Sequence, residues 1–150
     1  MFHTDMHTAR LTIRRVELLE TDDAGELQLV TVRGYADEVL KGAHRVQMFG
    51  ETSHAPAGAH GLALLVNGRP DQSIVLGLEH PTHRPKGIGA GERVLYNAHG
   101  DIIGIYKQKI RIVTQEFEVV APTIKLTGDI THTGNMDTTG VHTDSNGVHV

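Results

Sequence analysis

A seven-residue repeat in the last third of the chain, from about Gly100 to Thr133, constrains the fold more than any other feature. Each unit holds two apolar residues two positions apart, which is the spacing of side chains on one face of a β-strand. These apolar positions are Ile103 and Ile105, Ile110 and Ile112, Phe117 and Val119, and Ile124 and Leu126. The repeat therefore predicts a run of short strands joined by tight corners.

The same period occurs in coiled coils, but their apolar positions alternate at spacings of three and four rather than two and five. Glycine, proline and many β-branched residues in this stretch also disfavour a helix. Strands this short offer one narrow apolar face each, so they cannot bury it alone. Identical copies wound around a shared axis are the simplest partners. An ordinary β-meander within one domain is the alternative.

The composition supports a need for additional buried surface. The 150 residues are 39% hydrophobic and only 4% aromatic, without tryptophan, which is thin for a self-sufficient core and favours oligomerisation. The net charge of −4 does not favour nucleic-acid binding. The absence of cysteine excludes disulfides, thiol catalysis and cysteine-bound zinc. Neither a signal peptide nor a membrane-length apolar window is apparent, so we expect a soluble protein made in the cytosol.

The first half of the chain alternates apolar and polar residues in several short segments. Residues 11–19 fit either a strand or a short amphipathic helix, whereas residues 26–32 alternate as a clear strand. Residues 35–40 and 44–49 are predicted as two strands on either side of Lys41-Gly42. Several short strands in succession suggest a small barrel of the OB type.

A loop and a hairpin follow this region. Residues 50–61 are rich in small residues and lack periodicity, which predicts a loop. Residues 62–66 form a continuous apolar run, residues 67–71 a turn, and residues 73–78 a returning strand, which together predict a β-hairpin. Residues 80–91 are rich in Pro and Gly and should be a connecting loop.

Four segments carry a resemblance to a known family. They are Val46–Gly61 (VQMFGETSHAPAGAHG), the hairpin from Leu62 to Leu78 with GRPDQS at its turn, Lys86–Tyr96 (KGIGAGERVLY) followed by HGD, and Gly128–Gly134 (GDITHTG). Together they closely resemble the Mu-type central spike family of phages, also called baseplate assembly protein V. The resemblance extends from roughly Glu26 to Val150.

The resemblance implies an all-β homotrimer. Residues 1–90 would form an OB-like domain that attaches to the baseplate hub protein of a contractile tail. Residues 91–150 would form an intertwined triple-stranded β-helix, the spike shaft and tip, with the eight apolar residues of the repeat as its trimer core. The implied function is structural and not enzymatic. The spike of a phage or prophage tail, located in the virion baseplate, pierces the outer membrane of the host when the tail contracts.

The tip of the spike departs from the family pattern. In many relatives a His-x-His pair from each of three chains binds an iron ion, but no His-x-His occurs in this sequence. The candidates are His142 and His149, which are one repeat apart and would lie in different layers. His149 from three chains could supply three nitrogen ligands to iron or another metal ion, with water or an anion completing the shell.

Other residue patterns do not favour catalysis. The eleven histidines include no His-Glu-x-x-His frame, and no Gly-x-Ser-x-Gly elbow occurs. We expect His54 to be a structural loop residue whose ring donates to the backbone. The competing function is that of a monomeric OB-type binding module for single-stranded nucleic acid or oligosaccharide. That function would need a basic groove with stacking aromatic residues, for which this negatively charged chain is a poor match.

Overall fold

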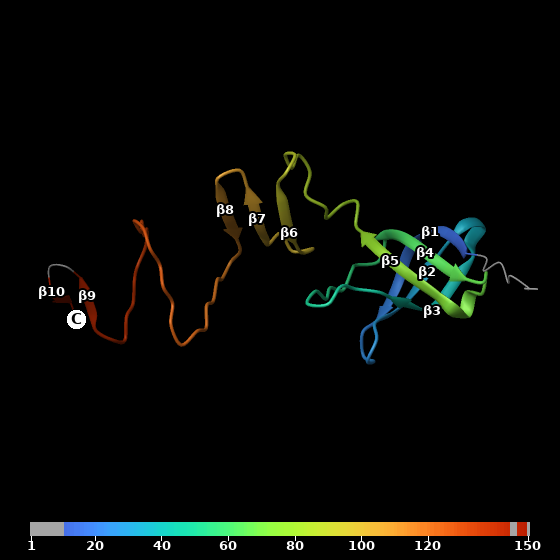
Figure 1. Cartoon of the computed structure of the whole chain (residues 1–150), viewed down its shortest axis with the longest axis horizontal. Coiled ribbons are helices and arrows are strands. Elements are labelled where there is room, and N and C mark those ends of the chain that lie inside the picture. The colour runs from blue at the N-terminus through green and yellow to red at the C-terminus, as the bar shows by residue number, and fades with distance from the viewer. Residues whose placement is uncertain (1–10, 145–146, 150) are drawn as a thin grey trace, which may run out of the picture. The chain divides into compact units, whose positions relative to one another are not determined.

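A computed structural model describes residues 11–144 and 147–149, and their structure is all-β, as the sequence predicts (Figure 1). Two single-turn 3₁₀ segments, Tyr35–Asp37 and Pro70–Gln72, interrupt the strands. No helix in these residues is long and apolar enough to cross a lipid bilayer. The strands are β1 (Leu11–Asp22), β2 (Leu29–Arg33), β3 (Val39–Arg45), β4 (His60–Val66), β5 (Ser73–Glu79), β6 (Arg93–Tyr96), β7 (Ile102–Tyr106), β8 (Lys109–Val113), β9 (His142–Asp144) and β10 (Gly147–His149).

The first five strands close into a barrel in the order β1-β2-β3-β5-β4. All neighbouring pairs are antiparallel except β3 and β5, which are parallel. The barrel predicted from the short strands is therefore present. Its core is aliphatic and includes several alanines, because a five-stranded barrel leaves little room inside. The core residues are Val16, Leu18, Val30, Val32, Leu40, Ala43, Ala55, Ala59, Ala63, Leu65, Val75 and Leu78.

Strand β1 resolves the strand-or-helix alternative at the start of the barrel. Its residues 11–17 pair with β4, and its residues 17–22 pair with β2, so the strand bridges two neighbours. Val16 and Leu18 point into the core two positions apart, as strand geometry requires. The register shifts between Leu18 and Glu20, where an irregularity lets one strand serve both neighbours.

Strand β3 corrects the prediction of two strands around Lys41-Gly42. The structure has one strand from Val39 to Arg45, preceded by the 3₁₀ turn, and residues 46–49 are not a strand. Val30 pairs with Ala43 and Val32 with Leu40, so two residues of β3 oppose one of β2. Lys41-Gly42 is thus a bulge, which Gly42 accommodates at a φ of 68°. A glycine that looked like a turn signal bends a continuous strand instead.

The hairpin of β4 and β5 confirms the strand–turn–strand prediction, and its register is irregular next to Gly61. A Cβ atom at Gly61 would lie 2.5 Å from the carbonyl oxygen of Leu76 on the neighbouring strand. The two backbones can approach this closely only because Gly61 has no side chain. Residues 80–92 then connect β5 to β6 without a further strand.

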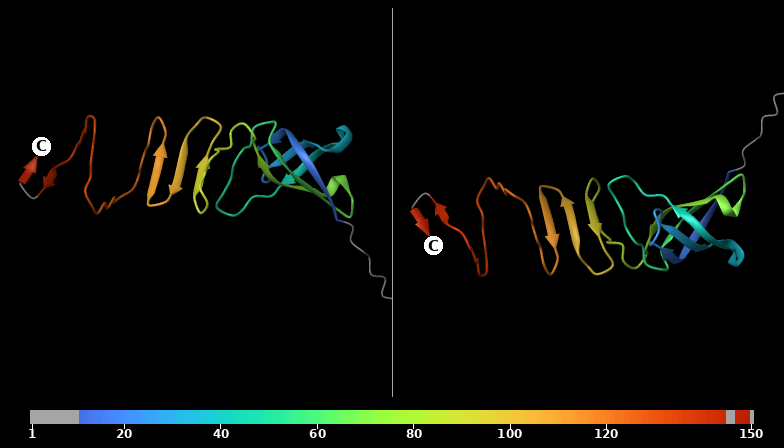
Figure 2. Two further views of the ribbon diagram at one scale, coloured as in Figure 1. Left: turned by 90° about the horizontal axis from the view of Figure 1, so that it is seen from above. Right: turned by 90° about the horizontal axis from the view of Figure 1, so that it is seen from below.

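The chain divides into two compact units, the first ending at Glu116 and the second beginning at Phe117. The first holds the barrel and the sheet of β6, β7 and β8, whose three strands lie side by side (Figure 2). The second holds the β9–β10 pair. The predicted domain boundary between residues 90 and 91, which follows the resemblance, stays a prediction.

Candidate assembly surface

The sheet of β6, β7 and β8 presents one apolar face that the described residues of the chain leave exposed. Ile103 lies opposite Ile112, and Ile105 lies opposite Ile110, so the first four apolar positions of the repeat share a face. Leu95 on β6 lies opposite Ile103 and extends this face by one strand. The repeat did not predict Leu95, because the turn of residues 97–101 moves it eight residues from Ile103 rather than seven.

The apolar positions beyond residue 116 are also exposed. Phe117, Val119, Ile124 and Leu126 have no strand partner, because the described chain forms no strand between β8 and β9. Each of the eight predicted core residues exposes at least 43% of its surface. A soluble monomer rarely leaves so many large apolar side chains in one regular series exposed to water. The series has the pattern of a core but lacks the neighbours that would bury it.

The opposite face of this sheet carries a different arrangement. Gly104 is buried in the centre of β7, and the ring of Tyr106 lies directly over it. A Cβ atom at Gly104 would lie 2.2 Å from a ring carbon of Tyr106. The Nζ of Lys109 is 5.8 Å from the centroid of the same ring. On this face the ring of Tyr106 covers Gly104 and Lys109 lies near that ring, so the more apolar face of Ile103 and Ile105 is the candidate surface for a partner.

The tip histidines lie on the last two strands. β9 pairs with β10 in antiparallel register, and His149 is opposite His142. The two residues are therefore on adjacent strands, while the positions of their side chains fall outside the described residues. Among the residues that are described, no group of three potential ligands converges within one chain. The prediction of a metal site at His149, with one ligand from each of three chains, stays a prediction.

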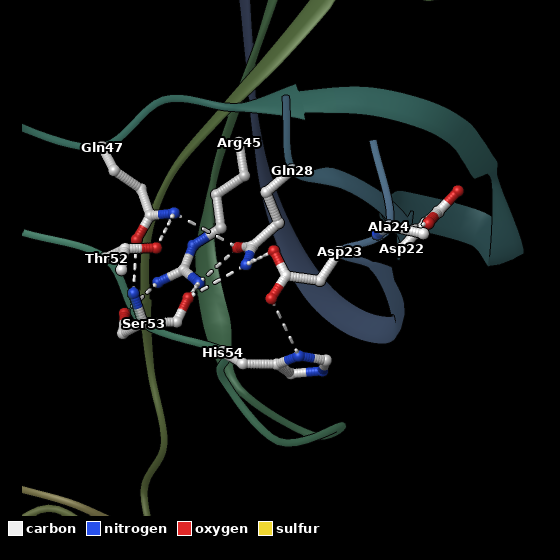
Figure 3. A network of polar contacts seen from close by, with 9 residues as sticks. All are labelled: Asp22, Asp23, Ala24, Gln28, Arg45, Gln47, Thr52, Ser53 and His54. Atoms are coloured by element: carbon white, nitrogen blue, oxygen red, sulfur yellow. Dashed lines mark hydrogen bonds and ion pairs between the residues drawn. The ribbon is translucent and has the colours of Figure 1, made fainter. Parts of the chain in front are cut away.

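A buried polar network fixes the loop between β3 and β4, which includes most of the Val46–Gly61 motif (Figure 3). Arg45 donates from Nη1 to Oε1 of Gln28 at 2.7 Å and to the carbonyl oxygen of Ser53, and from Nη2 to Oγ of Ser53 at 2.9 Å. Gln28 in turn donates from Nε2 to Oδ1 of Asp23 at 2.8 Å. The backbone N–H of Ser53 donates to Oε1 of Gln47 at 2.8 Å. These contacts hold the loop against the barrel.

Arg45 is the central group of this network, and it is only 7% exposed. Burial lowers the pKa of its guanidinium from the ordinary value, while the charge of Asp23 acts in the opposite direction. No carboxylate of a described residue forms an ion pair with the guanidinium, and Gln28 hydrogen-bonds to both Arg45 and Asp23. Sequence reasoning missed both Gln28 and Arg45. The only signal was a polar residue within each of two predicted strands, residues 26–32 and 44–49.

The histidines of this region correct one expectation. The ring of His54 does not donate to the backbone. Its Nδ1 lies 3.8 Å from Oδ2 of Asp23, and its side chain is largely exposed. The backbone contact belongs to His80, whose Nε2 lies 3.2 Å from the carbonyl oxygen of Ala57 and whose Nδ1 accepts from the N–H of Thr82 at 3.2 Å. His54 instead flanks the Asp23 end of the network.

Comparison with known proteins confirms the Mu-type resemblance. The family described as Bacteriophage Mu Gp45, N-terminal, matches residues 15–82, which include β1 to β5 almost completely. The Mu-like prophage FluMu protein gp45 of Haemophilus influenzae is 25% identical over 143 residues, covering 89% of this chain and 78% of that protein. The baseplate puncturing device gp45 of Escherichia phage Mu is 26% identical over 134 residues, covering 83% of this chain and 68% of that protein.

Proposed function

From its relationship to the Mu gp45 proteins, we propose that this chain is the central spike of a contractile phage or prophage tail. Three copies form the spike, which is a structural part of the virion baseplate and has no catalytic task. The barrel attaches the spike to the hub protein of the tail. The strands beyond residue 91 intertwine as a triple-stranded β-helix, whose tip pierces the outer membrane of the host during contraction.

The observation that carries this proposal is the exposed apolar series from Ile103 to Leu126. The cross-strand pairs of β7 and β8 supply two layers of an apolar axis, and the seven-residue phase supplies further layers through residue 126. Burying these side chains against two other copies would contribute about 25 cal/mol for each Å² removed from water. It would also provide strand partners for backbone groups of residues 117–126 that lack them in a single chain.

Rigidity is the property that the proposed task requires. Strands hydrogen-bonded between chains, around a dry apolar axis, form a shaft in which bending must break many contacts together. The charged residues Lys109 and Arg111 lie on the face of β8 opposite Ile110 and Ile112, so they would face water in the trimer. The shaft would then present a polar exterior and an apolar axis, as the alternation of β-strands allows.

The mass of the full-length chain in dilute solution tests this proposal. Native mass spectrometry or sedimentation should show three times the chain mass of 16.3 kDa, with no stable single chain. A folded monomer whose residues 100–133 resist proteolysis would contradict it. Elemental analysis of the same sample tests the tip. One iron or other metal ion per three chains, lost in His149→Ala, would support a three-histidine site.

A further inference from the structure

The loop of residues 46–59, which we call the brace, is attached to the barrel at two places. The first is the Arg45 network, which holds Ser53. The second lies at the irregularity of β1, where the N–H of Leu18 donates to the carbonyl oxygen of Ala59 at 2.7 Å. The carbonyl oxygen of Leu18 in turn accepts from the N–H of Gly58 at 2.9 Å. The brace is therefore fixed on the barrel, although it contains neither strand nor helix.

The connection of residues 80–92 is tied at both ends. At the barrel end, the ring of His80 contacts the carbonyl oxygen of Ala57 in the brace. At the sheet end, the carboxylate of Glu92 accepts from the N–H of Gly89 at 3.0 Å and from the N–H of Lys107, next to the β7–β8 turn, at 3.1 Å. Between these ties, no hydrogen bond joins residues 85–88 to the rest of the described chain. Residues 85–88 are therefore the hinge between the barrel and the sheet.

One ion pair crosses this hinge. Nη2 of Arg93, the first residue of β6, lies 3.4 Å from Oε1 of Glu51 in the brace. The two side chains are 63% and 55% exposed, so water and salt reach the pair. Because the brace is fixed on the barrel and Arg93 belongs to the sheet, this contact joins the two without passing through residues 85–88.

Two hollows flank the brace where it approaches the sheet. One, of about 670 Å³, lies between residues of the brace and residues 94–96 of β6. The other, of about 720 Å³, lies between residues 52–56 of the brace, the end of β5 and the turn of residues 97–99. Protein interiors are close-packed and leave few voids larger than a water molecule. The barrel and the sheet are therefore joined here by a few polar contacts rather than by a packed core.

We propose that the brace sets the orientation of the β6–β8 sheet against the barrel, with the Glu51–Arg93 ion pair as the contact that can open. An exposed ion pair shifts an equilibrium by up to about fivefold, so the chain exchanges between a braced and a released form. This device belongs to the single chain and does not depend on the trimer. In the spike of the proposed function, on which this last role alone rests, the brace gives the force of contraction a second path from barrel to shaft.

The distance between two spin labels in the full-length chain tests this proposal, because the natural chain contains no cysteine. Val39→Cys places one label on the barrel, and Val113→Cys places the other at the end of β8. Expression with an excess of the natural chain leaves at most one labelled chain in any assembly, so each distance lies within one chain. We expect one main distance. Glu51→Arg should raise the fraction of chains at other distances about twofold to fivefold, since two like charges then meet across the hinge.

Combining Glu51→Arg with Arg93→Glu reverses the pair and should restore the main distance. Arg69→Glu is the control, because it breaks the exposed Arg69–Asp71 pair in the β4–β5 turn and should leave the distances unchanged. Sodium chloride at about 1 M should act like Glu51→Arg on the labelled chain that retains Glu51 and Arg93, because salt screens an exposed pair. This measurement decides the matter if Glu51→Arg does not fold. Distances unchanged by salt and by Glu51→Arg would overturn the proposal, as would a reversed pair no better than Glu51→Arg alone.

Discussion

At the scale of single residues, Arg45 shows how a buried cation is retained without a direct carboxylate partner. Its guanidinium donates to three acceptors, on Gln28 and Ser53. The side-chain amide of Gln28 in turn donates a hydrogen bond to Asp23. Gln28 is itself buried, and a buried acceptor that loses its donor costs about 1–3 kcal/mol. The network thereby fixes the loop of residues 46–59, which has no strand or helix to hold it.

Replacement of this cation should therefore destabilise the barrel. We expect Arg45→Leu to lower the free energy of unfolding by about 1–3 kcal/mol, because it removes the guanidinium that donates to the buried Oε1 of Gln28 and that holds Ser53 of the loop. Urea unfolding followed by circular dichroism measures the change. Arg69→Leu is the control, since it breaks only the exposed pair with Asp71 and should cost about 0–1 kcal/mol. An equal effect of the two variants would contradict the importance of the network.

Gly61 is a second position at which one residue limits the barrel. We expect Gly61→Ala to cost about 1–3 kcal/mol, because the new methyl group would push β4 away from the carbonyl oxygen of Leu76. Thermal unfolding of the variant gives the measurement. Gly25→Ala is the matched control, as the nearest atom to its added Cβ lies at an ordinary 3.6 Å. A variant at position 61 as stable as the natural chain would show that the two strands can separate freely.

At the scale of elements, β8 has two faces that differ in their side chains. Ile110 and Ile112 lie on the face shared with Ile103 and Ile105, whereas Val113 lies on the other face, opposite Ile102. Only the first face continues the seven-residue series toward Phe117. A strand of five residues thus carries one face for the proposed axis and one face for the exterior.

Charge substitution on the two faces of β8 should have different effects. We expect Ile110→Asp to prevent trimer assembly, because three carboxylates would meet in a dry axis at a cost of about several kcal/mol each. Phe117→Asp, seven residues further along the apolar series, should also prevent trimer assembly. Val113→Asp, an equal change on the outer face, should leave the trimer intact. Native mass spectrometry distinguishes these results, and unchanged trimers with aspartate at positions 110 and 117 would contradict the inward assignment.

At the scale of the whole molecule, the two units differ in how much of their stability a single chain can supply. The barrel has a core of its own, although a small one. The residues from Phe117 onward form few contacts within the chain, and their large apolar side chains are exposed. The stability of residues 117–149 should therefore come from association between chains rather than from a core within one chain.

Association of this kind makes stability depend on concentration. Wherever unfolding is reversible, we expect the melting temperature of the natural chain to rise with protein concentration, because dissociation into three chains accompanies unfolding. Differential scanning calorimetry across a hundredfold range of concentration measures the shift. Ile110→Asp should lose this dependence and retain only the transition of the barrel. A concentration-independent melting temperature for the natural chain would indicate a monomer.

The sequence by itself determined the all-β class, the β4–β5 hairpin and the phase of the apolar series, because each follows from local spacing and turn chemistry. It also carried the Mu-type motifs. Only the tertiary structure decided that residues 11–19 are a strand and that Lys41-Gly42 is a bulge, since each depends on neighbours distant in the chain. The same holds for the Arg45 network. Alternation shows that two faces exist, but only the closed barrel decides which of them is turned outward.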